Sequence, residues 1–387
     1  MPLQATVFSR LLQHIPWDVF DLAVEEHDGE KGCRELTARS HLTALLAGQL
    51  IHANGLRDIE AVMEAQAPML KRRRILPARR STLSDANAVR PAAPFEAVIA
   101  AMLAKLSPTK ARYARRDLRL IDSTLVRPGA GAAEWARFES RCVAAKVHVV
   151  YDPRAQVPTF FELTGGNVND ITLAKKAMPI APGATYAFDL GYYDFGFWAD
   201  LDAQRCRFVT RLKKNTRLTV LSRRPVPANS NITFDRVVRL PSRLARSRTN
   251  PFSKPGRAIG IVLDTGRRIT LFTNDLKSSA VTIAELYKTR WQIELFFRWI
   301  KQNLHIHHFH GRSQNAVRLQ IAAAIIVYLM VKLAHMATGA KKTVAIFFKT
   351  VTAHLFNLID LNLLVQRIER RGALHTPRDA GQLEFVL

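Results

Sequence analysis

The sequence has few cysteines and lacks an apolar run of membrane-spanning length. Its three cysteines, Cys33, Cys142 and Cys206, are isolated. They suggest neither a disulfide framework nor a CxxC zinc site, and a reducing cytoplasm fits them. The longest apolar run, residues 321–331, is too short to cross a bilayer and predicts a buried helix. Residues 1–16 lack an uninterrupted apolar segment of the signal-peptide kind. We therefore expect a cytoplasmic protein without a membrane partner.

Acidic residues are scarce relative to basic ones. The 387 residues include 32 Asp and Glu against 57 Lys and Arg, which gives a formal net charge of +25 at pH 7. Such an excess predicts a polyanionic partner, either a nucleic acid or a membrane surface, and the lack of a spanning segment favours nucleic acid. The length is sufficient for two or three domains with a large core.

The stretch 287–301, YKTRWQIELFFRWIK, contains neither glycine nor proline, so a helix is allowed throughout. At about 3.6 residues per turn, Tyr287, Arg290, Glu294 and Lys301 fall on one narrow face of that helix. Arginine and lysine suit phosphate groups, and a lone carboxylate among them suits a metal ion. The alternative is an ordinary charged surface with i,i+4 pairing.

Two further carboxylates end predicted strands. Asp122 follows LRLI and Asp189 follows YAF. The predicted strands span residues 118–122, 146–151, 157–163, 186–189 and 208–213. Three antiparallel strands, a helix, a strand, a helix and a strand are the order of a ribonuclease H-like core, in which the first and fourth strands are neighbours. Asp122 and Asp189 would then lie close together and repel each other unless a divalent cation neutralised them. Each Asp by itself is more often a turn or cap residue.

Two other aspartates belong to the same region. Asp170 follows a Gly-Gly turn at the start of a predicted helix, and we expect it to support the site or the fold. Asp194 is expected to be a surface residue.

The spacing Tyr-x2-Arg-x3-Glu-x6-Lys resembles the signature of the insertion-sequence-four family of bacterial DDE transposases. The segments DST at Asp122 and DLGYYD at Asp189 resemble its other acidic motifs, and the resemblance covers nearly the whole chain. It implies that Asp122, Asp189 and Glu294 are catalytic and bind two Mg²⁺ or Mn²⁺ ions. Tyr287, Arg290 and Lys301 would bind backbone phosphates.

The same resemblance implies the partners and the organisation of the chain. The partners would be double-stranded DNA, as terminal inverted repeats and as target, and a second copy of the chain in a homodimer. We expect the core at residues 112–340, a mostly β insertion at about 216–280 and a helical tail at 341–387. Arg211, Lys213 and Lys214, at the entry to the insertion, are candidate phosphate contacts, although each alone is more often a solvated cation.

Residues 1–107 predict an all-α domain. A helix, a basic turn at residues 71–74 and a short helix capped by Ser81 resemble a helix-turn-helix. The segments LRDIE and STLSDAN-x2-RP also resemble the amino-terminal domain of this transposase group. Arg79, Arg80 and Ser81 would then contact DNA, and a helical bundle with a solvated basic loop is the alternative.

The last third of the sequence contains a histidine cluster, two predicted helices and a polar tail. The cluster consists of His305, His307, His308 and His310, whose spacing matches no zinc pattern, so we expect a strand or loop facing DNA. Residues 315–333 predict a helix that covers the sheet, and residues 344–363 predict another helix before a tail from about Arg367.

The sequence thus predicts an α/β protein: a metal-dependent, cut-and-paste DNA transposase with a ribonuclease H-like core. Two alternatives remain open. One is a catalytically inactive, transposase-derived DNA-binding regulator, and the other is a nuclease of the same fold.

Overall fold

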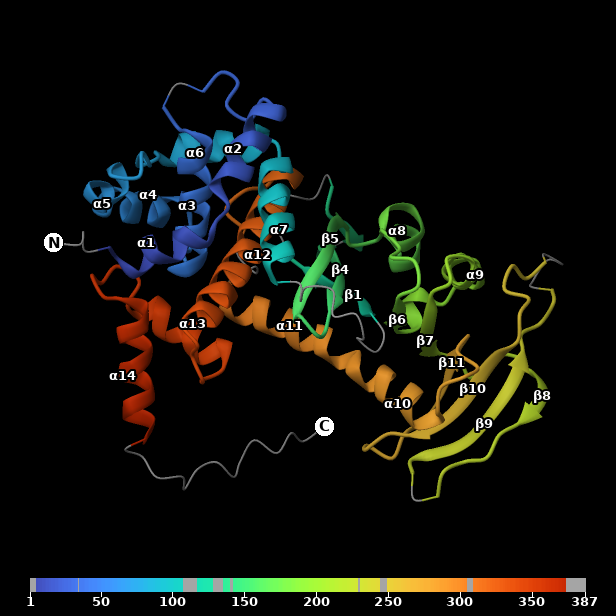
Figure 1. Ribbon diagram of the computed structural model, residues 1–387. Helices are drawn as coiled ribbons and strands as arrows, with labels where there is room; N and C mark the ends of the chain where they lie inside the picture. Colours follow the sequence, from blue (N-terminus) through green and yellow to red (C-terminus); the bar gives the residue numbers. More distant parts are fainter. Residues whose placement is uncertain are drawn as a thin grey trace. The chain divides into compact units, whose positions relative to one another are not determined.

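The computed structural model describes residues 5–33, 35–106, 117–127, 135–139, 142–228, 230–243, 249–304 and 309–373 (Figure 1). Compact packing divides the chain into two units. The helical unit comprises Met1–Pro108, Val126–Ala144 and Trp299–Glu384, and the α/β unit comprises Thr109–Leu125, Ala145–Arg298 and Phe385–Leu387. The helical unit therefore combines segments that lie far apart in the sequence.

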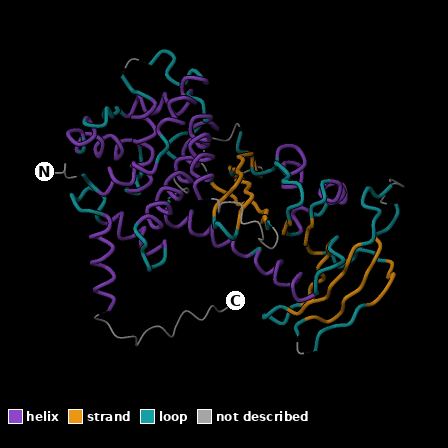
Figure 2. The backbone as a smooth tube through the Cα atoms, in the orientation of Figure 1, coloured by secondary structure: helices purple, strands orange, loops and turns teal. Residues whose placement is uncertain are grey.

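The described residues of the first part of the helical unit form helices (Figure 2). These are α1 (Val7–Leu11), η1 (Leu12–His14), α2 (Trp17–Glu26), α3 (Ala38–Leu50), α4 (Leu56–Ala65), α5 (Ala67–Lys71), α6 (Arg80–Val89) and α7 (Ala93–Leu106). The prediction that Ser81 caps α6 is wrong. The N-cap is Arg79, because its carbonyl accepts the first helical hydrogen bond, from Leu83 N at 2.9 Å, and Ser81 lies inside the first turn.

Helix α12 (Gln314–Ala337) forms the core of the helical unit. It packs against α3, α6, α7 and α13 (Val344–Ala353), which are helices of its own unit. Among the described helices it is the one long and apolar enough to cross a membrane, but most of it is buried against other helices. A helix that is apolar on all sides is expected in such a position.

The predicted helix 344–363 is divided into α13 and α14 (Leu361–Ala373), which also extends beyond the predicted start of the tail. Between them the chain bonds to the N-terminal helix: Phe8 N donates to Leu355 O at 2.8 Å and Val7 N to Asn357 O at 3.1 Å. Because these carbonyls serve α1, they are not available to continue α13.

The α/β unit is built on a nine-stranded sheet of order β5-β4-β1-β6-β7-β11-β10-β9-β8. The strands are β1 (Leu118–Val126), β4 (Ala145–Asp152), β5 (Val157–Gly165), β6 (Thr185–Phe188), β7 (Arg207–Arg211), β8 (Thr219–Arg223), β9 (Ile232–Arg239), β10 (Gly256–Val262) and β11 (Arg268–Thr273). β4 and β5 are antiparallel, whereas β1 pairs with β6 and β6 with β7 in parallel. The predicted adjacency of the first and fourth core strands is confirmed. The remaining strands, β2 (Arg137–Glu139) and β3 (Cys142–Val143), form a separate hairpin.

The region of the expected insertion contributes strands β8, β9, β10 and β11, which extend the main sheet. β11 pairs antiparallel with β7, with Leu271 opposite Arg211, and β10, β9 and β8 follow outward. A core of aromatic rings lies over this junction. Trp198, from α9 (Phe195–Ala203), stacks on Phe272 of β11 with ring centroids 5.2 Å apart and lies 5.5 Å from Phe208 of β7. Strands β9, β10 and β11 thus share one hydrophobic core with the central strands.

The segment that contains the signature spacing forms two helices where the sequence predicted one. These are α10 (Ala280–Thr289) and α11 (Trp291–Asn303). At the junction Arg290 N donates to Tyr287 O at 3.1 Å, three residues back, and Thr289 Oγ1 donates to Glu285 O at 2.9 Å. A threonine hydroxyl bonded to the carbonyl four residues back bends helices. Tyr287 therefore lies on α10, and Glu294 and Lys301 lie on α11.

Candidate active site

Asp122 lies inside strand β1, beside the end of β6. The register pairs Ile121 with Phe188, so Asp122 and Asp189 are the next residues along two neighbouring parallel strands. The prediction that Asp122 ends its strand is wrong, because β1 continues to the buried Val126. The closeness of the two aspartates does not depend on this detail, since the strand register produces it.

Backbone hydrogen bonds hold both aspartate side chains. Asp122 Oδ1 accepts from Ser123 N at 2.8 Å. Asp189 is the N-cap of η3 (Leu190–Tyr192), and its Oδ1 accepts from Gly191 N at 2.8 Å. A Cβ on Gly191 would stand 3.0 Å from Asp189 Oδ1 and 3.0 Å from Asp170 Oδ2. Glycine at this position of the DLGYYD segment therefore leaves room for two carboxylates.

Glu294 is joined to Asp122 through Arg290. One guanidinium nitrogen of Arg290, Nη1, lies 3.4 Å from Asp122 Oδ2, and the other, Nη2, lies 2.5 Å from Glu294 Oε1. Both contacts are partly buried. Arg290, predicted to bind phosphate, thus contacts two of the three predicted catalytic acids.

The charges of the other two acids contribute to the pKa of Asp122. Burial, opposed by the Ser123 N–H and by Arg290 and reinforced by the charges of Asp189 and Glu294, raises the pKa of Asp122 to about 7. A carboxyl in this position is stabilised when a cation approaches it.

The donor set fits a hard divalent cation, because it consists of carboxylate oxygens. In this structure, however, no group of three or more His, Cys, Asp or Glu side chains within the described ranges gathers closely enough to hold one ion. Arg290 bridges Asp122 and Glu294 here, so ion binding would require this guanidinium to move.

The other predicted phosphate-binding side chains of the α/β unit have different environments. Tyr287 is buried; burial raises the pKa of its phenol, while Arg290 and Arg211 lower it and Asp189 raises it, so all three lie within electrostatic reach. Lys213 is exposed and lies over the Tyr193 ring, 4.6 Å from its centroid. Lys214 is also exposed.

Lys301 lies two turns beyond Glu294 on α11, past the boundary between the two units at Arg298. It is partly buried, and burial lowers the pKa of its amine. The two units share this helix.

The predicted DNA-binding residues of the N-terminal region belong to the helical unit. Arg79, Arg80 and Ser81 are all exposed at the start of α6. Arg80 and Ser81 line a groove together with Arg57 and Asp58 of α4. His310 lies at the same groove, and its N–H donates to Gln320 Oε1 at 2.9 Å, while His305, His307 and His308 lie outside the described residues.

The sequence analysis missed the partners of Asp170. Ser123 Oγ donates to Asp170 Oδ1 at 2.8 Å, and Lys146 Nζ lies 3.1 Å from the same oxygen. Lys146 and His148 alternate on β4, and this period of two could have indicated a polar face. Asp194, expected at the surface, is partly exposed; it caps α9 by accepting from Phe197 N at 2.8 Å and pairs with Lys175.

Comparison with known proteins agrees with this geometry. Residues 113–330, more than half of the chain, match the family described as "Transposase DDE domain", and residues 3–72 match a "Domain of unknown function". A Sinorhizobium fredii protein named "Putative transposase y4zB" is 39% identical over 279 residues, covering 72% of this chain and 78% of that protein. "Probable transposase for insertion sequence element IS5377" of Geobacillus stearothermophilus is 28% identical over 249 residues, covering 62% and 63%.

A cryo-EM structure of a piggyBac transposase synaptic complex with hairpin DNA aligns with a TM-score of 0.46 and 11% identity, over 97% of this chain and 81% of that chain. The family match and the first relative are sufficient for assignment. The chain belongs to the family of transposases with a DDE domain. It is a DNA transposase, an enzyme that binds DNA and depends on divalent metal ions.

Proposed function

We propose that this protein is a cut-and-paste transposase of the insertion-sequence-four type, with a ribonuclease H-like core and with Asp122, Asp189 and Glu294 as its catalytic acids. One observation carries the proposal. The parallel register of β1 and β6 makes Asp122 and Asp189 neighbours, and Glu294 approaches Asp122 through a shared guanidinium. The strand order β5-β4-β1-β6-β7 supports the assignment of the core.

The three acids would hold two divalent ions, Mg²⁺ or Mn²⁺, because both ions prefer oxygen ligands. Bound ions of this kind activate an attacking oxygen and stabilise a leaving oxygen in phosphodiester cleavage and strand transfer. The contribution of the protein is to orient the carboxylates: Ser123 N fixes Asp122, and Gly191 N fixes Asp189. Without these hydrogen bonds each carboxylate could rotate away from the shared site.

Arg290 has two roles in this proposal. Its guanidinium offsets the charges of Asp122 and Glu294. A guanidinium also binds phosphate through two parallel hydrogen bonds. On DNA binding Arg290 turns from the carboxylates to a backbone phosphate. Tyr287, whose ring centroid lies 5.8 Å from the guanidinium carbon, binds the same phosphate. DNA would thereby free two acids for metal ions.

The remaining basic residues bind the rest of the DNA. Lys301, Arg211 and Lys213 contact phosphates near the cleaved bond. Arg79, Arg80 and Ser81 contact the terminal inverted repeats of the element, and their exposure in the first turn of α6 supports this role. We further propose that a homodimer pairs the two ends of the element and acts in the bacterial cytoplasm on nucleoid DNA.

The test compares Asp122→Asn with wild type on DNA that carries the element's own ends. We expect the variant to lose metal-dependent nicking by at least about 10³-fold, because a ligand of the reacting ions is lost, and to keep its affinity for the ends. Asp264→Asn, which removes a carboxylate from an exposed turn, is the matched control. Nicking by Asp122→Asn at the wild-type rate would contradict the assignment.

The same assay separates the alternatives. A transposase cuts at the ends and joins them to a target, a nuclease cuts without joining, and a regulator binds without cutting. The presence of inverted repeats around the coding region would argue further against a nuclease.

A further inference from the structure

Asp170 lies at the centre of a polar cluster that the proposed reaction does not use directly. It is the first residue of α8 (Asp170–Ala177), yet neither it nor Asn169 caps this helix with a side-chain hydrogen bond. Its Oδ1 instead accepts from Ser123 Oγ at 2.8 Å and lies 3.1 Å from Lys146 Nζ. The carboxylate is thus directed toward strands β1 and β4.

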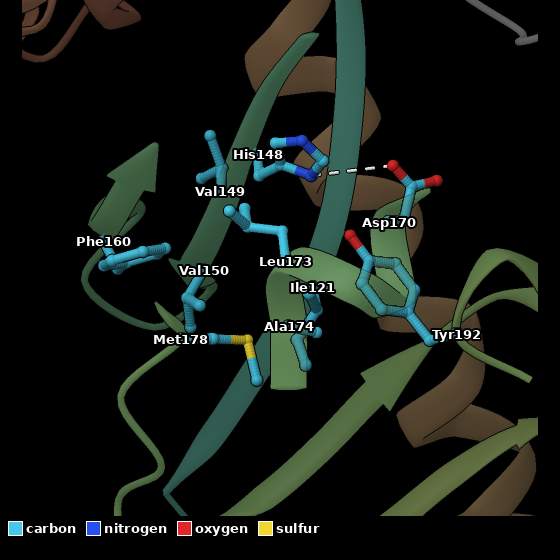
Figure 3. A pocket seen from close by; sticks show the side chains of 10 residues that line it. All are labelled: Ile121, His148, Val149, Val150, Phe160, Asp170, Leu173, Ala174, Met178 and Tyr192. Atoms are coloured by element: carbon cyan, nitrogen blue, oxygen red, sulfur yellow. Dashed lines mark ion pairs between the residues drawn. The ribbon is translucent and has the colours of Figure 1, made fainter. Parts of the chain in front are cut away.

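Two more buried polar atoms face the same carboxylate (Figure 3). His148 Nδ1 lies 3.6 Å from Asp170 Oδ1, and the Tyr192 hydroxyl points toward Asp170. Both atoms are buried, and neither has a hydrogen-bond partner among the residues that the structure describes. A small cavity of about 10 Å³, the size of one water, lies among these residues. Four polar side chains from β1, β4 and η3 therefore surround one carboxylate.

This cluster is connected to both aspartates of the proposed site. Ser123 donates its Oγ hydrogen to Asp170 and its backbone N–H to Asp122 Oδ1 at 2.8 Å, so one residue joins the two carboxylates. On the other side, Asp170 Oδ2 and Asp189 Oδ1 each lie 3.0 Å from the place of a Cβ on Gly191. Asp170 therefore contacts Ser123, the residue that holds Asp122, and it restricts the space open to the Asp189 carboxylate beside Gly191.

We propose that Asp170 is a positioning residue that holds Asp122 and Asp189 in the geometry required for metal binding. It acts through Ser123 on Asp122 and across Gly191 on Asp189. Lys146 balances its charge, so this fourth carboxylate does not need a metal ion of its own. The inference rests on the proposed role of Asp122 and Asp189 as metal ligands.

The alternative is that Asp170 only stabilises the packing of α8 on the sheet. Metal affinity separates the two roles, because residues that orient metal ligands typically contribute 10–100-fold to affinity, whereas a packing residue changes only stability. The measurements are Mn²⁺ binding by calorimetry to the full-length protein in complex with DNA that carries the element's ends, with the same DNA alone as the blank, and the melting temperature of the same protein samples.

The variants are Asp170→Ala, the isosteric Asp170→Asn, Ser123→Ala and the double variant of Ser123→Ala with Asp170→Ala. Ser123→Ala keeps the Asp170–Lys146 pair, so it tests the connection even if Asp170→Ala folds poorly. We expect Asp170→Ala and Ser123→Ala each to weaken Mn²⁺ binding about 10-fold. The double variant should bind Mn²⁺ no more weakly than Asp170→Ala, because both changes break the same hydrogen bond between Ser123 and Asp170.

Asp194→Asn is the matched control, since Asp194 also lies at a helix start and pairs with a lysine, Lys175, at 3.2 Å. It should lower the melting temperature and leave Mn²⁺ affinity unchanged. Wild-type Mn²⁺ affinity in Asp170→Ala and Ser123→Ala would overturn the proposal, and so would complete loss of binding in Asp170→Asn, which would make Asp170 a ligand. If Asp122→Asn and Asp189→Asn also bind Mn²⁺ normally, the proposed function fails as well, and that result is distinct.

Discussion

The two units of this transposase use their carboxylates differently. In the helical unit acids pair with arginines of distant segments, such as Glu96 with Arg318 at 2.7 Å and Asp360 with Arg10 at 2.9 Å. In the α/β unit Asp122 and Glu294 share Arg290, and Asp189 adds its charge to the same region. Pairs of one acid and one arginine are balanced in charge and stabilise the packing of helices. A group of three acids with one arginine is unbalanced in charge; it costs folding free energy and indicates a functional site.

Another buried ion pair of the α/β unit is balanced in charge, which shows that the excess of acids around Asp122 is local. Asp235 on β9 and Arg257 on β10 form a buried pair in which each side chain is only 2% exposed. Arg257 donates to both oxygens of Asp235 and to Ser278 O. The sheet can therefore satisfy a buried carboxylate where only structure is required.

The largest effect is expected on DNA cleavage by the α/β unit, while DNA binding by the helical unit stays unchanged. Asp189→Asn and Glu294→Gln should each reduce cleavage at least about 10³-fold, since each removes a proposed metal ligand. Affinity for the terminal repeats should remain within about 3-fold of wild type, as measured by fluorescence anisotropy at fixed salt. Cleavage retained by either variant would remove that residue from the proposed site.

In the helical unit we expect the opposite result, in which DNA binding weakens and cleavage is unchanged. Arg79→Gln combined with Arg80→Gln should weaken binding to the repeats about 10-fold or more and reduce the dependence of log affinity on log salt by roughly 2, because two phosphate contacts are lost. Cleavage at saturating DNA should be unchanged. Lys342→Gln with Lys349→Gln removes two charges elsewhere in the same unit and serves as the control. Equal losses in the two double variants would mean that only net charge matters.

A glycine in each unit gives a smaller contrast. Gly191→Ala should raise the Mn²⁺ concentration for half-maximal cleavage about 10-fold, because the new Cβ would stand 3.0 Å from Asp170 and Asp189 oxygens. Gly55→Ala introduces a methyl group at an extended residue with no atom within 4 Å, so it should have no such effect. A metal titration of cleavage checks both. Similar responses would show that Gly191 is not a spacer for carboxylates.

The smallest expected effect is a difference in acid stability between the units. Burial lowers the pKa of His41, in α3, to about 4, so the unfolded state binds more protons between about pH 4 and pH 6.5. The helical unit should thus lose on the order of 1 kcal/mol by pH 5.5. In the α/β unit the pKa of His148 is also lowered to about 4, but that of Asp122 is raised to about 7. Proton uptake by Asp122 stabilises the folded state as pH falls, which offsets His148.

Hydrogen-exchange protection of α3 and β1, corrected for intrinsic rates at pH 7.5 and pH 5.5, measures this difference. His41→Gln should remove the acid sensitivity of α3. Asp122→Asn should introduce acid sensitivity in β1, because the offset is lost. Unchanged protection of α3 in wild type at pH 5.5 would contradict the predicted role of His41.

Local patterns made much of the fold predictable. The alternation of apolar residues indicated β4, β5 and the four insertion strands, and strand-end aspartates in the order of a ribonuclease H-like core predicted that Asp122 and Asp189 would be neighbours. The absence of glycine and proline from 287–301 was a weaker guide. It allowed a helix, but it did not exclude the division at Arg290, where a threonine side chain bonds to a carbonyl.

The sequence by itself determined which segments form strands and helices and which acids could meet, because these properties depend on spacing along the chain. Only the tertiary structure decided the partners of the acids. Arg290 contacts Asp122 across 168 positions, and Ser123 contacts Asp170 across 47. It also placed α12 among the helices α3, α6, α7 and α13. The physical reason is that burial and hydrogen bonding between distant segments depend on how whole faces pack, and residue spacing does not encode this.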